Sequence, residues 1–147
     1  MAQMNSTNSL SSTMEDYLET IYELKQVNGV ARVGEIASKL NVKSSSVNSA
    51  LKYLSDQNLV VHEKYGYVGL TKEGEKTAAD VKSKHDILFW FLTEFLMIDP
   101  KEAEKEACCI EHSISTETFE RLTKFFKFLE KGLLPRSRRY CSCLKLI

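Results

Sequence analysis

Apolar residues recur at spacings of three and four along much of the first third of the chain, which is typical of amphipathic helices. The apolar stripe of the first predicted helix, residues 14–27, consists of Tyr17, Leu18, Ile21, Tyr22 and Leu24. Thr13 is its expected N-cap, and Asn28-Gly29 ends it. Two shorter helices, residues 32–40 and 44–57, follow with a three-residue turn between them, and the second is expected to have a serine N-cap. Short helices joined by so tight a turn predict a helix-turn-helix.

The period changes after residue 57. Residues 59–64 and 67–70 are rich in β-branched and aromatic side chains, and Tyr65-Gly66 between them is a turn signal. A two-stranded hairpin that directly follows a helix-turn-helix is a wing. The pattern therefore predicts a winged-helix domain over residues 14–76.

The rest of the chain returns to helical periodicity and is rich in aromatic residues. Helices are expected over residues 72–95 with Thr71 as N-cap, from Asp99-Pro100 onward, and over residues 116–131 with Ser115 as N-cap. The aromatic side chains of these helices are Phe89, Trp90, Phe91, Phe95, Phe119, Phe125, Phe126 and Phe128. Helices that are apolar around so much of their circumference usually bury a second face, so we expect a homodimer. In the alternative interpretation, these aromatics only cover the winged helix.

Composition and charge are those of an ordinary globular protein. The 147 residues include 20 Lys and Arg and 20 Asp and Glu, so a nucleic-acid-binding surface would require segregated charges. Apolar runs are too short for a membrane span. Residues 1–13 are polar, lack the apolar core of a secretion signal and are expected to be disordered. Residues 133–147 form a basic tail.

The four cysteines occur as two close pairs, Cys108/Cys109 and Cys141/Cys143, and neither spacing is that of a zinc ribbon. Without a secretion signal, we expect a cytoplasmic protein with free thiols. The tail pair is expected to be inert, with adventitious metal binding or DNA contact as the alternatives.

The segment Ala-Cys-Cys-Ile-Glu-His at residues 107–112 carries the most specific chemistry of the chain. In a helix, Cys108, Glu111 and His112 fall at i, i+3 and i+4 on one face, whereas Cys109 points elsewhere and is expected to belong to the core. A thiol, a carboxylate and an imidazole together suit a divalent transition metal better than Mg²⁺ or Ca²⁺. The alternative is a half-buried helix face with a small apolar cysteine and a solvated Glu-His pair. Three ligands leave a coordination sphere incomplete, so other elements must supply the rest.

Other ligand types stand on two further helices, namely Asp16 and Glu19 at i, i+3 and His85 before an apolar run. The order Met-Glu-Asp-Tyr-Leu-Glu-x-Ile-Tyr, winged helix, Lys-His and Cys-x-x-Glu-His, over residues 14–131, resembles the diphtheria toxin repressor family. More narrowly, it is similar to the shorter branch of manganese transport regulators. The resemblance implies a mainly α fold, in which an N-terminal winged helix-turn-helix precedes a helical dimerisation and metal-binding domain, residues 77–132.

The resemblance also implies a dimeric transcriptional repressor of metal-uptake genes that is activated by a divalent metal. Its primary metal site would consist of Asp16, Cys108, Glu111 and His112. A neighbouring site would use His85 and Glu19 and share Glu111 or Asp16. A metal that joins Asp16 to the second domain would hold the two DNA-reading helices of the dimer nearer to the spacing of successive major grooves.

Departures from the family pattern bear on the metal. The manganese branch usually has Glu where this chain has Cys108. The iron-responsive branch has Cys there but usually has Met in place of Asp16. Phe89 stands where both branches commonly have Glu, so a second site is expected to be incomplete. We expect Fe²⁺ or Mn²⁺, with Zn²⁺, Co²⁺ or Ni²⁺ as alternatives, because a thiolate favours Fe²⁺, Co²⁺, Ni²⁺ and Zn²⁺ over Mn²⁺.

DNA reading is expected at the start of the second helix of the helix-turn-helix, which enters the major groove. The candidates there are Lys43, Ser44, Ser45, Ser46, Asn48 and Lys52. Contacts to the DNA backbone are expected from Arg32, Lys64, Tyr65 and Tyr67. The alternative for the serine run is a helix cap with solvated neighbours. Because the reading helix carries few cations, we expect double-stranded DNA with two half-sites.

Other function classes predict different behaviour. A metal-independent winged-helix regulator would bind an organic ligand between the aromatic helices. A zinc hydrolase would use Glu111 as its base, but the chain has no His-Glu-x-x-His spacing, so we expect no enzyme. A winged helix that binds protein instead of DNA is the third alternative.

Overall fold

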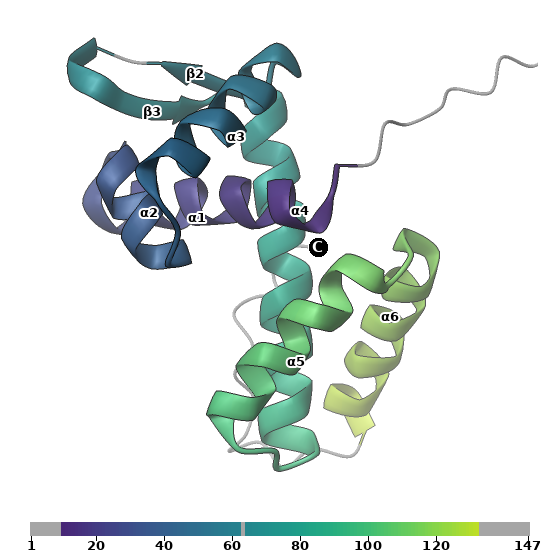
Figure 1. The fold of residues 1–147 in the computed structure, drawn as a ribbon. Helices are drawn as coiled ribbons and strands as arrows, with labels where there is room; N and C mark the ends of the chain where they lie inside the picture. The colour runs from purple at the N-terminus through teal and green to yellow at the C-terminus, as the bar shows by residue number, and fades with distance from the viewer. Residues whose placement is uncertain (1–9, 63, 133–147) are drawn as a thin grey trace, which may run out of the picture. The chain divides into compact units, whose positions relative to one another are not determined.

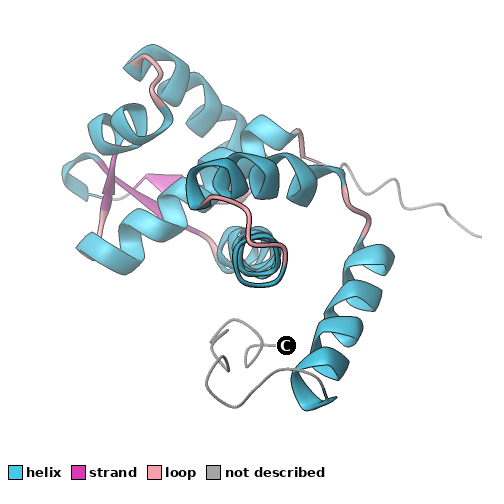
Figure 2. Cartoon of the chain, turned by 90° about the horizontal axis from the view of Figure 1, so that it is seen from below, coloured by secondary structure: helices cyan, strands magenta, loops and turns pink. Residues whose placement is uncertain are grey.

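The computed structural model describes residues 10–62 and 64–132. The chain divides into two compact units, Met1–Ala79 and Asp80–Ile147. Helices dominate the described part and a small antiparallel sheet accompanies them (Figure 2), which confirms the mainly α fold class. The predictions for residues 1–9 and for the tail with Cys141 and Cys143 lie outside the described residues.

The N-terminal unit is a winged helix-turn-helix, as predicted. Its helices are α1 (Ser12–Asn28), α2 (Val33–Leu40) and α3 (Ser44–Asp56). The hairpin of β2 (Val60–His62) and β3 (Tyr67–Leu70) follows α3, and β2 packs against it (Figure 1). The fully buried side chains of the three helices include Leu18, Ile21, Ile36, Val47, Leu51 and Leu54. They lie three or four positions apart within α1 and within α3, so the packing of these helices follows from their apolar spacing.

A third strand, β1 (Ala31–Arg32), pairs with β3, so the order in the antiparallel sheet is β1-β3-β2. Ala31 lies opposite Val68, and both are buried; Arg32 lies opposite Tyr67, and Arg32 is exposed. Since successive side chains alternate between the faces of a sheet, Arg32 and Tyr67 both point away from the core. The sequence did not predict β1, because two residues are too few to show alternation.

The N-caps of two helices differ from those predicted. Helix α1 begins at Ser12, where Ser11 and not Thr13 is the N-cap and accepts a hydrogen bond from the Met14 N–H at 3.4 Å. Leu10 packs against the core cluster. Helix α3 has Lys43 at its N-cap position and no side-chain cap, so Ser44 is its first helical residue. The serine run therefore stays available on the surface of α3.

The C-terminal helices are α4 (Lys72–Trp90), α5 (Pro100–Ser113) and α6 (Thr116–Gly132). The predicted caps Thr71 and Ser115 are confirmed, since each side chain accepts a backbone N–H of the first turn, and Asp99 at the predicted start of α5 does the same. The predicted helix 72–95 instead changes at Phe91–Phe95 into a π-helical turn, η2. The Thr93 hydroxyl donates to the carbonyl oxygens of Phe89 and Trp90, and such bonds disturb the helical ladder.

The aromatic residues of the C-terminal unit fall into an internal and an exposed set. Trp90 and Phe126 are buried and meet edge to face at 5.8 Å between ring centres, and Phe91 stacks on Phe126 at 4.8 Å. Phe125 and Phe128 are about half and two-thirds exposed. Only part of the aromatic surface is therefore used within this unit. Among the described residues, no helix combines the length and apolarity needed to cross a membrane.

Candidate metal centre and nucleic-acid interface

Helix α5 brings three potential metal ligands together. One ligand atom each of Cys108, Glu111 and His112 lies within 4.8 Å of the others. The regular turns between the Asp99 cap and Ser113 place these residues on one face, as their spacing predicted. Cys109 points away from this face, as predicted, but the expectation that it belongs to the core is wrong, because its side chain is exposed.

Glu111 is the buried centre of this cluster, with only 2% of its surface exposed. Its Oε2 lies 2.7 Å from Nδ1 of His85, which α4 contributes. Its Oε1 is buried and accepts no hydrogen bond from the described residues; His112 Nε2 is 3.3 Å away but does not meet hydrogen-bond geometry. A buried carboxylate oxygen without a partner is costly, and a cation would remove that cost. The donor set and this oxygen together fit a bound transition metal.

The second nitrogen of His85 faces a residue that the sequence analysis missed. His85 Nε2 lies 3.3 Å from Oε2 of Glu104, a side chain that is 63% exposed. Glu104 precedes Glu111 by seven residues, which is about two helical turns, so the same periodicity could have found it. Phe89 stacks on His85 with 6.3 Å between ring centres. The chain therefore has an apolar ring beside His85 where the family commonly has a Glu ligand.

Asp16 and Glu19, the two other predicted ligands, belong to the N-terminal unit. They occupy successive turns of α1 at i and i+3, and both are half-buried. Their participation in a metal site is part of the proposal below.

The start of α3 presents the predicted DNA-reading residues to solvent. Lys43, the three serines that follow, Asn48 and Lys52 are exposed, whereas Val47, Ala50 and Leu51 on the opposite face are buried. Ser49 is exposed as well, and its hydroxyl donates a hydrogen bond to the Ser45 carbonyl oxygen at 3.0 Å. The reading face of α3 is thus polar, with small side chains that allow close approach to DNA.

The wing contributes a second exposed group of candidates. Tyr65 is 92% exposed at the turn and has a φ of 64°, in the left-handed region that a non-glycine residue seldom adopts. Arg32 Nη2 donates to Tyr67 Oη at 3.2 Å, and this hydrogen bond raises the pKa of Arg32. Lys64 belongs to the same turn, but its side chain lies outside the described part of the structure.

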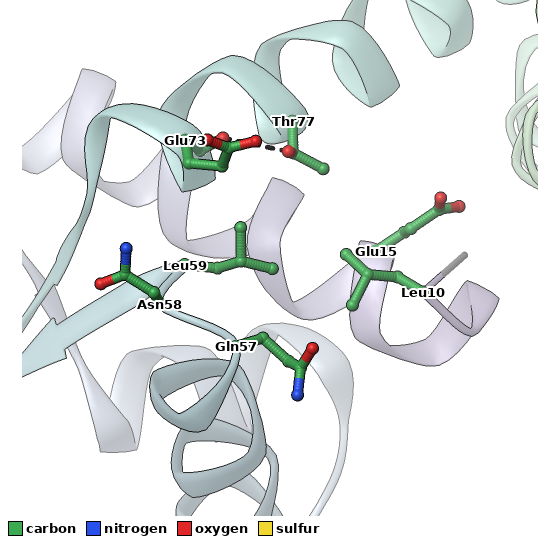
Figure 3. Close-up of a pocket in the computed structure, with 7 residues that line it drawn as sticks. All are labelled: Leu10, Glu15, Gln57, Asn58, Leu59, Glu73 and Thr77. Atoms are coloured by element: carbon green, nitrogen blue, oxygen red, sulfur yellow. Dashed lines mark hydrogen bonds between the residues drawn. The ribbon is translucent and has the colours of Figure 1, made fainter. Parts of the chain in front are cut away.

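A pocket of about 350 Å³ also opens on the N-terminal unit (Figure 3). Its lining consists of Leu10, Glu15, Gln57, Asn58, Leu59, Glu73 and Thr77. None of the predicted metal or DNA residues lines it. The Thr77 hydroxyl donates a hydrogen bond to the carbonyl oxygen of Glu73 at 3.0 Å.

Comparison with known proteins assigns both parts of the chain. Residues 9–68 match the N-terminal DNA-binding domain of iron-dependent repressors, and residues 71–133 match their metal-binding and dimerisation domain. An uncharacterised HTH-type transcriptional regulator of Methanocaldococcus jannaschii is 40% identical over 124 residues, which is 83% of this chain and 99% of the relative. The HTH-type transcriptional regulator MntR of Listeria monocytogenes is 33% identical over 80% of this chain and 82% of its own length.

Solved structures agree with these matches. The manganese regulator SloR superposes with a TM-score of 0.70 and 34% identity over 78% of this chain. The chain spans about half the length of that structure, 54%. The matched domains cover both the winged helix and the cluster around Glu111, in the order that the motifs predicted. The chain therefore belongs to the iron-dependent repressor family, the diphtheria toxin repressor family of metal-dependent, DNA-binding transcriptional regulators.

Proposed function

We propose that this protein represses genes for iron or manganese uptake when a divalent metal occupies the cluster around Glu111. The observation that carries the proposal is the buried Oε1 of Glu111, which has no hydrogen bond to the described residues and lies near a thiol and two imidazoles. In a purely structural role, an amide or an apolar side chain would fill this position at lower cost.

The proposed primary ligands are Asp16, Cys108, Glu111 and His112. A bound Fe²⁺ or Mn²⁺ would supply the positive charge that balances the carboxylates and the thiolate. The Cys108 thiolate favours Fe²⁺ over Mn²⁺, and Zn²⁺, Co²⁺ or Ni²⁺ would also be accepted on ligand chemistry alone.

His85 and Glu19 are proposed as a neighbouring site, to which Glu104 adds a third residue. If His85 donates its Nδ1 hydrogen to Glu111, its neutral Nε2 presents a lone pair to the Glu104 carboxylate. Two acceptors at 3.3 Å repel each other unless a cation or a proton lies between them. This arrangement supports a second, weaker cation position, in spite of Phe89.

Coupling to DNA follows from where the proposed ligands stand in the chain. Asp16 belongs to the winged-helix unit, and Cys108, Glu111 and His112 belong to the helical unit. Without metal, the carboxylates of Asp16 and Glu111 disfavour each other's approach. Shared coordination would reverse that preference and restrict the orientation of α3, to the extent that the metal binds the restricted arrangement more tightly.

Dimerisation is proposed through the apolar surface of the helical unit. The large exposed apolar side chains there are Phe95, Leu96, Met97, Phe125 and Phe128. These exposed apolar side chains lie on a domain that matches a dimerisation domain, which supports a second copy of this chain as the partner. A symmetric dimer presents two α3 helices, so the DNA would contain two half-sites.

Metal-dependent binding to the upstream region of the protein's own gene tests the proposal. Fluorescence anisotropy with a labelled duplex is recorded in chelator, Mn²⁺, Fe²⁺ under anaerobic conditions, and Zn²⁺. We expect tight binding only with metal. His112→Ala should abolish the response and Cys108→Ala should change which metals produce it, whereas Cys109→Ala, the adjacent exposed thiol, should leave it intact.

Equal affinity in chelator and in metal would refute the proposal and favour a metal-independent regulator. The metal content of protein purified anaerobically, measured by mass spectrometry, then identifies the ion. Two ions per subunit would support the neighbouring site, and loss of one ion in Glu104→Gln would assign Glu104 to it.

A further inference from the structure

Arg32 and Tyr67 form a pair at the base of the wing. Contacts between α3 and DNA bases do not require this pair. Arg32 Nη2 donates to Tyr67 Oη at 3.2 Å. The guanidinium carbon also lies 5.1 Å from the centre of the Tyr67 ring. The two residues are opposite each other in the β1–β3 pairing, on the outer face of the sheet. One phenol therefore fixes the guanidinium through both its ring and its oxygen.

The backbone at Arg32 is also fixed. The Arg32 N–H donates to Glu35 Oε2 at 3.1 Å, and Asn28 Nδ2 donates to Glu35 Oε1 at 3.4 Å. The Glu35 carboxylate is thus engaged in capping α2. Among the described residues, no carboxylate forms a salt bridge with the Arg32 guanidinium.

The pair has more donors than acceptors. A guanidinium carries five N–H donors, and one of them is used by Tyr67 Oη. Because Tyr67 Oη accepts that bond, its own hydrogen is available for another acceptor. Two neighbouring donor groups, one of them cationic, suit an anion with two adjacent oxygens. A phosphodiester has this arrangement, and arginine binds it with a pair of parallel N–H groups.

We propose that Arg32 and Tyr67 together form a preorganised site for one phosphodiester of the DNA backbone. The guanidinium binds one non-bridging oxygen, and the Tyr67 hydroxyl donates to the other. This site rests on the DNA-binding function proposed above. Since a phosphate is the same at every base pair, the site fixes the position of the wing on DNA and does not select the operator sequence.

The test measures binding of the Mn²⁺-loaded dimer to its operator and to a random duplex over a salt series. Arg32→Gln should weaken binding to both duplexes and reduce the slope of log K against log salt by about 0.9 per bound subunit. Tyr67→Phe keeps the ring but removes the hydroxyl. It should leave the slope unchanged and weaken binding to both duplexes roughly two- to tenfold per subunit.

Two conservative variants serve as controls. Arg121→Gln removes another exposed arginine, which is paired with Glu117 on α6, and Tyr53→Phe removes another partly exposed hydroxyl on α3. Both should bind DNA as the wild type does. Arg32→Lys, which keeps the charge but not the fork, should weaken binding at an unchanged slope. Melting curves identify any variant whose loss is a folding defect, and Arg32→Lys then replaces Arg32→Gln.

A Tyr67→Phe protein that binds both duplexes normally would overturn the proposal, because the pair would then only fasten β1 to β3. A variant that loses affinity for the operator alone would also overturn it, since its residue would read bases. Wild-type protein that binds neither duplex would refute the proposed function together with this site. Normal metal-dependent binding with unaffected Arg32 and Tyr67 variants would refute the site alone.

Discussion

Replacing Glu111 by glutamine should stabilise the metal-free protein and remove its stabilisation by metal. The carboxylate has lost its hydration, yet only Oε2 has a hydrogen-bonding neighbour, His85 Nδ1 at 2.7 Å. Glutamine has nearly the same shape and no charge. Its carbonyl oxygen can accept from His85 at the place of Oε2, and its amide carries no buried charge.

The expected size of the effect follows from the single unsatisfied oxygen. A buried acceptor without a partner costs about 1–3 kcal/mol, and a charged one more. We therefore expect Glu111→Gln to raise the metal-free stability by about 1–2 kcal/mol, or roughly 2–8 °C in melting temperature at this chain length. Wild-type protein should gain about 2.7 kcal/mol from metal at roughly 100 times its Kd, and the variant should gain nothing.

Thermal unfolding followed by circular dichroism, with chelator and with Mn²⁺, measures both effects. Glu106→Gln, an exposed substitution on the same helix, should change neither curve. A metal-free Glu111→Gln protein that melts clearly below the wild type would refute the reasoning. It would mean that the histidines stabilise the carboxylate more than burial destabilises it.

Three further predictions concern the scaffold. Gly74→Ala would normally favour a helix, but its Cβ would lie 1.9 Å from the Leu59 carbonyl oxygen, so we expect a loss of about 2 kcal/mol or more in urea unfolding. Tyr65→Gly removes the strain of a left-handed φ, about 1 kcal/mol, but glycine also gains about as much conformational entropy in the unfolded chain. The melting temperature of this variant should therefore stay near that of the wild type, while its DNA affinity falls. Phe128→Asp should shift the protein from dimer to monomer in sedimentation, whereas the same change at exposed Val27 should not.

The elements of the fold could be predicted wherever one local cause determines them. The apolar stripe of α1 and the caps Thr71 and Ser115 are set by side chains within one or two turns, and the structure has them as predicted. Strand β1 depends on pairing with β3, about 36 residues away, and has no signal of its own. The π turn at Phe91–Phe95 leaves no signal in the apolar spacing, which is the same for an α-helix that continues to residue 95.

The same distinction applies to the candidate site. The i, i+3, i+4 spacing is a local property, so it placed Cys108, Glu111 and His112 on one face. Which of them is buried depends on how α4 packs against α5. That packing brings His85 to Glu111 and makes this carboxylate the fully enclosed member. Glu104 was missed because an exposed glutamate on a charged helix is ordinary until a histidine from another helix lies beside it.

The burial of Cys108 and Glu111 distinguishes the residue that determines metal preference from the residue that adds to metal affinity. Cys108 is half-buried, so its contribution to metal binding is chiefly the chemical preference of a thiolate, which ranks the ions. Glu111 is fully enclosed, and relief of its unsatisfied charge adds to the affinity for any divalent cation. Substitutions at Cys108 should therefore reorder the metals that activate DNA binding. Substitutions at Glu111 should remove activation by all of them. Without a buried charge to neutralise, the metal has little preference between the restricted and the unrestricted orientation of α3.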